Sequence, residues 1–153
     1  MHPSQPVLHR GQVQDLVQAM GRSTEAYCLI TALCALVIIQ PNMTLPERVS
    51  SDSRTTPGYG AYRATLFLDE SLRVRKSINY AESPTVNSII TSFFIFKVYL
   101  LLDKSNMAWF HLREATTLAL MMGMNEEETY TTGDPAANAR KCRLFWLLFV
   151  TER

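Results

Sequence analysis

Apolar residues recur at the spacing of an α-helix along most of the chain, and short polar breaks separate the helical segments. The first such segment covers residues 12–20. In the break that follows, Ser23 is placed to cap a second helix, which ends before Pro41. This second helix is apolar on nearly all sides, so we expect it to be buried in the core rather than to lie on the surface.

Two further helices are expected after a polar segment. Residues 62–78 predict an amphipathic third helix, in which Leu68, Leu72 and Arg75 follow one stripe. Pro84 suits the first position of a fourth helix. Polar side chains gather on one side of the first half of this helix, which is otherwise apolar apart from Lys97; they are Asn87, Ser88, Thr91 and Ser92.

The remaining pattern completes an all-helical chain. Asn106 is placed to cap a fifth helix, and Gly123 is placed to end it. A last helix covers residues 136–153. The pattern predicts about six helices and contains no convincing strand alternation, so the predicted fold class is all-α.

The fifth helix is apolar on two faces. One narrow arc is rich in alanine, which lets a neighbouring backbone approach closely, and Phe110, Leu120 and Met121 lie on the other side. A helix of this kind is expected between two layers, as in an irregular array of stacked helix pairs. The arc consists of Ala108, Leu112, Ala115, Ala119 and Met122.

Residues 41–60 differ in composition from the helical segments around them. They contain prolines, glycines and several Ser, Thr and Asp residues, and they are longer than an ordinary connection between helices. We therefore expect a flexible internal loop within one domain.

Composition narrows the range of functions. The 153 residues are 47% apolar and 19% charged, with a formal charge of +1, which excludes whole-chain disorder and suggests one domain. A domain that neutralised many phosphates by itself is usually more basic. Arg140, Lys141 and Arg143 form the only basic cluster, which is weak support for direct nucleic-acid binding.

The cysteines and the N-terminus predict a soluble intracellular protein. Cys28, Cys34 and Cys142 are too few for a disulfide framework, and their spacing does not match a zinc site. We expect reduced thiols, with Cys28 and Cys34 buried, and no metal in this chain. The first residues are polar and interrupted by proline, unlike a signal peptide, and no apolar run is long enough to span a bilayer.

No motif for a catalytic or cofactor site is present, and two residues are candidates for an interior polar site. His111 lies beside the alanine-rich arc and is interpreted as a partly buried, hydrogen-bonded side chain. Lys97 interrupts an apolar run, and we interpret it as a lysine whose stem is buried while its ammonium reaches the surface. The alternative for Lys97 is a buried ion pair or a contact with a ligand.

Aromatic side chains mark one face of the last helix. Phe145, Trp146 and Phe149 follow the spacing of neighbours on a helix. We interpret this face as part of the core.

Two segments carry a family resemblance. Residues 108–130 and, about ten residues later, residues 140–153 resemble the fungal-specific transcription factor domain. This domain is the regulatory middle-homology region that follows the zinc binuclear cluster of fungal activators. Within the family, the chain looks most like regulators of maltose, sucrose or starch utilisation. The residues that carry the resemblance are Trp109, Phe110, Arg113, Glu114, Arg143, Phe145, Trp146, Glu152 and Arg153.

The resemblance implies a function without a catalytic step. It implies an effector-response domain that regulates transcription by RNA polymerase II in the nucleus, with coregulators, a small-molecule inducer or other parts of a longer transcription factor as partners. DNA binding and zinc would belong to a six-cysteine module that these 153 residues do not contain. Because the family domain continues past Glu152 and Arg153, residues 1–153 are expected to be a truncated domain. A genuine short protein is the alternative.

Two other function classes remain open. Residues 85–123 have about the length of one helical-hairpin repeat, which is compatible with a protein–protein interaction scaffold that has no transcriptional role. No second copy occurs at that period, so a regular solenoid is not supported. A six-cysteine cluster upstream in the genome would distinguish the regulator from the scaffold. An enzyme ranks last, because no constellation of residues supports one.

Overall fold

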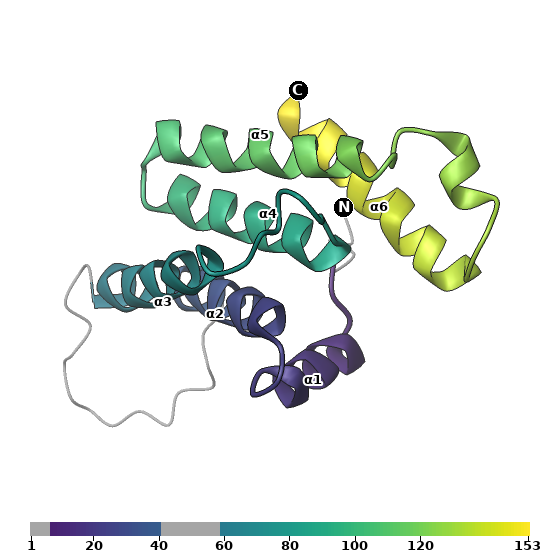
Figure 1. Ribbon diagram of the computed structural model, residues 1–153. Helices are drawn as coiled ribbons and strands as arrows, with labels where there is room; N and C mark the ends of the chain where they lie inside the picture. Colours follow the sequence, from purple (N-terminus) through teal and green to yellow (C-terminus); the bar gives the residue numbers. More distant parts are fainter. Residues whose placement is uncertain (1–6, 41–58) are drawn as a thin grey trace.

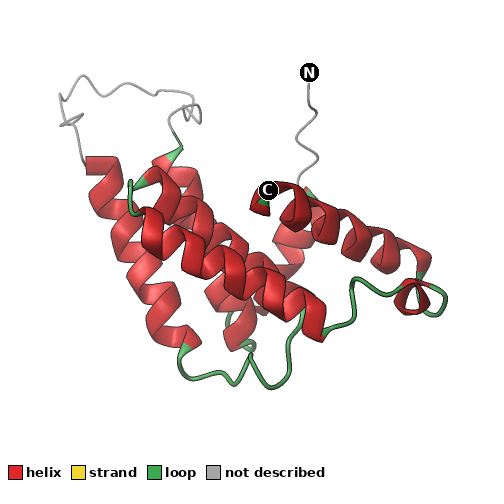
Figure 2. Cartoon of the chain, turned by 90° about the horizontal axis from the view of Figure 1, so that it is seen from above, coloured by secondary structure: helices red, strands yellow, loops and turns green. Residues whose placement is uncertain are grey.

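The computed structural model describes residues 7–40 and 59–153, and within these ranges all regular structure is helical. Figure 2 shows helices joined by loops, with no strand in the described part of the chain. The predicted all-α class is confirmed. The elements are α1 (Arg10–Ala19), α2 (Thr24–Ile39), α3 (Tyr59–Arg75), α4 (Val86–Leu101), α5 (Ser105–Met121), the short 3-10 helix η1 (Glu127–Tyr130) and α6 (Pro135–Glu152).

The helices are stacked in pairs, as expected. α2 packs along α3 and α4 packs along α5, while α2 also contacts α4, so the two pairs share one core (Figure 1). α1 lies against α2, and α6 contacts both α5 and α4. This arrangement brings the C-terminal end of α3, the first half of α4 and the middle of α5 together, although they are far apart in the sequence.

α2 and α4 occupy the centre of the molecule. α2 begins after Ser23, whose hydroxyl accepts a hydrogen bond from the Ala26 amide at 3.2 Å, as the sequence predicted. It buries 8 of its 16 residues, and α4 buries 11 of its 16. The predicted burial of the second helix is therefore confirmed.

The start of α4 differs from the prediction that Pro84 is its first residue. Pro84 lies outside the helix, and Thr85 is the N-cap. The Thr85 hydroxyl accepts a hydrogen bond from the Ser88 amide at 3.1 Å, and the Ser88 hydroxyl accepts one from the Thr85 amide at 2.9 Å. Because these side chains satisfy the free amides of the first turn, they set the start of the helix at Val86.

The reversal between α4 and α5 is tighter than predicted. Lys104 is the N-cap of α5, and Asn106 lies inside the first turn, so the prediction that Asn106 caps this helix is wrong. Asp103 adopts a left-handed conformation with φ of 59°, and the Lys104 amide donates to the Tyr99 carbonyl at 2.9 Å. The left-handed residue Asp103 and this hydrogen bond end α4, and α5 begins directly after them.

The end of α5 follows the prediction. Gly123 has φ of 68°, its amide donates to the Leu120 carbonyl at 2.9 Å, and the Met124 amide donates to the Ala119 carbonyl at 3.1 Å. These two bonds form a Schellman motif, and the Met124 side chain is buried.

Residues 41–58 of the loop predicted over residues 41–60 lie outside the described residues. Its last two positions are helical, because α3 already begins at Tyr59.

The expectation that α5 is covered on two faces is only half correct. Its alanine-rich arc is buried against α4, as predicted. Of its other apolar side chains Leu118 is buried, and the rest are exposed within the described structure; they are Met107, Trp109, Phe110, Leu120 and Met121.

The aromatic face of α6 was predicted to be part of the core, but two of its three side chains are exposed. α6 packs through Leu144 and Leu148, which are buried. Trp146 is 58% exposed and Phe149 is 39% exposed, because they lie on the side of the helix opposite to these leucines. Phe145 is half-buried and packs against the core.

Candidate functional site

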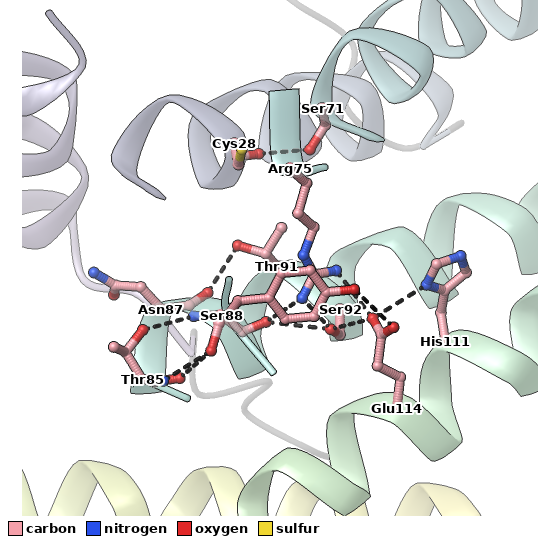
Figure 3. Close-up of polar contacts among 11 residues, drawn as sticks. Cys28, Ser71, Arg75, Thr85, Asn87, Ser88, Thr91, Ser92, His111 and Glu114 are labelled. Atoms are coloured by element: carbon pink, nitrogen blue, oxygen red, sulfur yellow. Dashed lines mark hydrogen bonds and ion pairs between the residues drawn. The ribbon is translucent and has the colours of Figure 1, made fainter. Parts of the chain in front are cut away.

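A buried arginine joins α3 to both helices of the α4–α5 pair. Arg75 is the last residue of α3, and only 5% of it is exposed. One guanidinium nitrogen donates to the Glu114 carboxylate at 3.1 Å. The other donates to the Ser92 hydroxyl at 2.6 Å and to the Ser88 carbonyl at 3.0 Å. Figure 3 shows the guanidinium between these groups of α4 and α5.

Glu114 of α5 is the acceptor at the centre of this polar network. Its carboxylate receives hydrogen bonds from the Ser92 hydroxyl at 2.8 Å and from the Tyr80 hydroxyl at 3.0 Å. The Tyr80 ring also lies under the Arg75 guanidinium, with 3.9 Å between the guanidinium carbon and the ring centroid. The charges of buried Arg75 and of Glu114, whose side chain is 18% exposed, therefore neutralise each other, and the Ser92 and Tyr80 hydroxyl groups add hydrogen bonds to the carboxylate.

The environment keeps Glu114 ionised. Burial by itself would raise the pKa of its carboxyl group. The neighbouring His111 imidazole, the charge of Arg75 and the hydrogen bond from Ser92 outweigh burial and lower this pKa to about 2. Burial raises the pKa of the Tyr80 hydroxyl, and the nearby Glu114 charge adds to the effect, so Tyr80 stays a hydrogen-bond donor at neutral pH.

His111 belongs to this network, and Lys97 does not. The His111 ring is buried, stacks on Tyr99 with centroids 5.4 Å apart and meets Phe110 edge-on at 5.2 Å. Its Nδ1 atom lies 3.5 Å from the Glu114 carboxylate. His111 is more deeply buried than the partial burial predicted for it, and its Nδ1 atom forms no hydrogen bond with a described residue, so the prediction of a hydrogen-bonded side chain is wrong for this atom.

Lys97 lies elsewhere on α4. It is half-buried, and its ammonium lies 5.3 Å from the centroid of the Phe93 ring. No acidic side chain of the described residues forms an ion pair with it. This position agrees with a buried stem and does not support the alternative of a buried ion pair.

The sequence contained signals for part of the network, because it also singled out His111 and Glu114. The polar side predicted on the first half of α4 includes Ser88 and Ser92, and both contact Arg75. Arg75 and Tyr80 were not proposed as site residues. A charged residue in an amphipathic stripe usually lies at the surface, so its burial could not be predicted from spacing.

The residues that carry the family resemblance do not form one site in the structure. Glu114 is half-buried in the network, whereas the Arg113 side chain is 76% exposed and forms an ion pair with Glu152 of α6 at 3.2 Å. Trp109 and Phe110 are exposed on α5. The remaining residues with exposed side chains lie on α6 or directly after it, and they are Arg143, Trp146 and Arg153.

The basic cluster does not form one surface. Arg143 is exposed, whereas Arg140 and Lys141 are half-buried. Burial lowers the pKa of the Arg140 guanidinium, whose Nε atom has no hydrogen-bond partner among the described residues.

The described residues offer little to a metal ion. Cys28 is buried as predicted, Cys34 and Cys142 are half-buried, and none of the three forms a disulfide. In residues 7–40 and 59–153, no group of three His, Cys, Asp or Glu side chains is placed to bind a metal. These residues therefore do not fit a zinc cluster. None of the described helices is long and apolar enough to cross a membrane.

The network fixes the end of α3 against α4 and α5. A shift of α5 along α4, or of the end of α3 away from them, must break the Arg75–Glu114 pair and leave a buried charge without a partner. Contacts of this kind favour discrete helix arrangements over gradual sliding.

Comparison with known proteins finds a similar sequence. The chain is 31% identical over 156 aligned positions to the probable sucrose utilization protein SUC1 of Candida albicans. The similarity covers 97% of this chain but 28% of that protein. No protein-family model matches the chain, and no solved structure matches it.

Proposed function

We propose that this chain is the effector-response region of a fungal transcription regulator that controls carbohydrate-utilisation genes. The observation that carries the proposal is the 31% identity, across nearly the whole chain, to a protein named for sucrose utilization. In this proposal the chain acts in the nucleus on transcription by RNA polymerase II and catalyses no reaction. DNA and zinc are bound by a separate module of a longer protein.

The packing suggests how such a region responds to an effector. A regulatory domain needs two helix arrangements whose balance is shifted by an inducer or a coregulator. The Arg75–Glu114 pair links α3 to α5 across α4. It therefore stabilises an arrangement in which these helices are in contact over one in which they are apart. An effector that favours either arrangement would change what the domain presents to its partners.

A scaffold for protein–protein interaction is the second candidate. The exposed aromatic side chains of α5 and α6 favour it, since large exposed apolar side chains are frequent at binding surfaces. The α4–α5 hairpin has the form of one unit of a helical repeat.

The test uses two matched arginine substitutions at the chromosomal locus. Arg75→Ala removes the buried cation, whereas Arg73→Ala removes an exposed arginine whose one ion pair among the described residues is with Glu70, three positions earlier. Transcripts are measured after transfer of the cells from glucose to sucrose or to maltose. We expect the Arg73→Ala strain to induce disaccharide-utilisation transcripts as the parent does, and the Arg75→Ala strain to lose the difference between the carbon sources.

Protein level, measured by immunoblot, controls for degradation. A strain that lacks the gene but keeps the full transcript response would contradict the proposal. Unchanged transcripts together with the loss of co-purifying proteins would support the scaffold.

A further inference from the structure

The outer face of α6 combines apolar and basic side chains. It consists of residues within about 120° of the helix circumference, on the side opposite to Leu144 and Leu148. Trp146 and Val150 are 58% and 66% exposed. We use the name outer face of α6 for Arg143, Trp146, Phe149, Val150 and Arg153, the last of which directly follows the helix.

The charges on this face have one sign. Within α6 the only acidic residue is Glu152, which lies to one side and pairs with Arg113 of α5. Arg143 forms no ion pair with an acidic residue of the described chain. Arg153 lies over the Phe149 ring at 4.4 Å, so its cation is held against the apolar surface.

The spacing of the two arginines adds a geometric condition. Ten residues of helix separate them, which corresponds to about 15 Å at about 1.5 Å per residue. A helical partner would need carboxylates about ten residues apart to reach both cations, with apolar side chains between them.

We propose that the outer face of α6 binds an acidic amphipathic helix. The apolar side of this helix packs on Trp146, Phe149 and Val150, and its carboxylates pair with Arg143 and Arg153. The apolar centre supplies most of the affinity, while the basic ends select an acidic partner over a neutral or basic one. A nucleic acid fits less well, because exposed apolar side chains occupy the middle of the face.

The test measures binding of a designed peptide to the 153-residue chain. The labelled peptide is an amphipathic helix with leucines at positions i, i+3, i+4 and i+7 and glutamates ten residues apart; its control carries lysines in place of the glutamates. We expect the acidic peptide to bind, with an affinity that falls as salt rises. Arg143→Glu and Trp146→Ala should each weaken binding about tenfold or more.

Arg63→Glu is the matched control, since Arg63 is an exposed arginine on α3. It should leave peptide binding unchanged. In a Trp109→Phe background, the fluorescence of Trp146 gives a second signal that needs no substitution on the outer face; we expect its emission to shift to shorter wavelength when the peptide covers it.

Three results would overturn the proposal. The first is equal binding of the acidic and lysine peptides, or equal effects of Arg143→Glu and Arg63→Glu. The second is a dimer that Trp146→Ala dissociates, because the occupant of the face would then be a second copy of the chain. The third is binding of a DNA duplex that is tighter than peptide binding and is lost in Arg143→Glu.

Discussion

The guanidinium of Arg75 meets the carboxylate of Glu114 at 3.1 Å inside the molecule, although 39 positions separate the two residues in the chain. Arg75 ends α3 and Glu114 lies in the middle of α5. The Ser92 hydroxyl of α4 accepts a hydrogen bond from Arg75 and donates one to Glu114. Each charge is tolerated in the core because the other is present.

Removal of one partner should therefore cost more than removal of both. We expect Arg75→Met to lower the free energy of unfolding by about 3–5 kcal/mol, since the Glu114 charge is left buried. The double variant Arg75→Met/Glu114→Leu should recover most of this loss. Urea denaturation gives both values, and Arg73→Met, at an exposed surface pair, should cost no more than about 1 kcal/mol. Equal losses at positions 73 and 75 would contradict the assignment.

The stability of the fold should depend on Glu114 in acid. The pKa of this carboxyl is lowered from 4.5 to about 2 in the folded protein. A lowered pKa stabilises the fold above the unfolded value and ceases to do so as pH falls through the folded value, so the contribution is lost between pH 4.5 and about pH 2. The contribution is about 3 kcal/mol at most.

The pH test compares wild type with Glu114→Gln by urea denaturation from pH 7 to pH 2. We expect the difference in unfolding free energy to shrink across the acidic window. Glu82→Gln, at an exposed carboxylate, controls for the loss of one negative charge. A difference that stays constant with pH would show that Glu114 is not held in its ionised form.

Gly123 should be more sensitive to substitution than Gly21. A side chain at Gly123 would be strained at φ of 68°, and its Cβ would lie 3.2 Å from the Thr129 hydroxyl oxygen. We expect Gly123→Ala to destabilise by about 1–2 kcal/mol. Gly21→Ala meets no atom within 4 Å and should change stability by less than about 0.5 kcal/mol. Similar effects at the two glycines would argue against a Schellman end for α5.

Lys97→Met should leave the fold as stable as before or more so. The lysine is half-buried without an ion pair among the described residues, and methionine keeps its stem without the cost of the charge. We expect a gain of up to about 1 kcal/mol, or about 3 °C in the thermal midpoint. Lys76→Met, at an exposed lysine, is the control. A marked loss of stability would indicate that the Lys97 ammonium has a partner that its position does not reveal.

The sequence predicted the centre of the fold well. α2 is apolar on nearly all sides, and α4 carries a single polar side. In a small helical protein, helices of this kind are buried between other helices. Gly123 also ended α5 as predicted, because the left-handed conformation there favours glycine strongly.

The outer faces of α5 and α6 could not be predicted in this way. Periodicity identifies an apolar face but does not say whether the chain supplies a neighbour to cover it. Phe110 and Trp146 were thus expected on covered faces and are exposed. The burial of Arg75 could not be predicted either, because it depends on Glu114, which only the folded chain brings near.

The uneven burial of the helices has a consequence for how the molecule opens. α6 buries Leu144 and Leu148 among its 18 residues, whereas α4 buries 11 of 16. We therefore expect backbone amides in α4 to exchange hydrogen with solvent only when the whole chain unfolds, and those in α6 to exchange through local detachment of that helix. A ligand of α6 should slow this detachment without a change in the core, so hydrogen exchange in α4 and in α6 reports on different events.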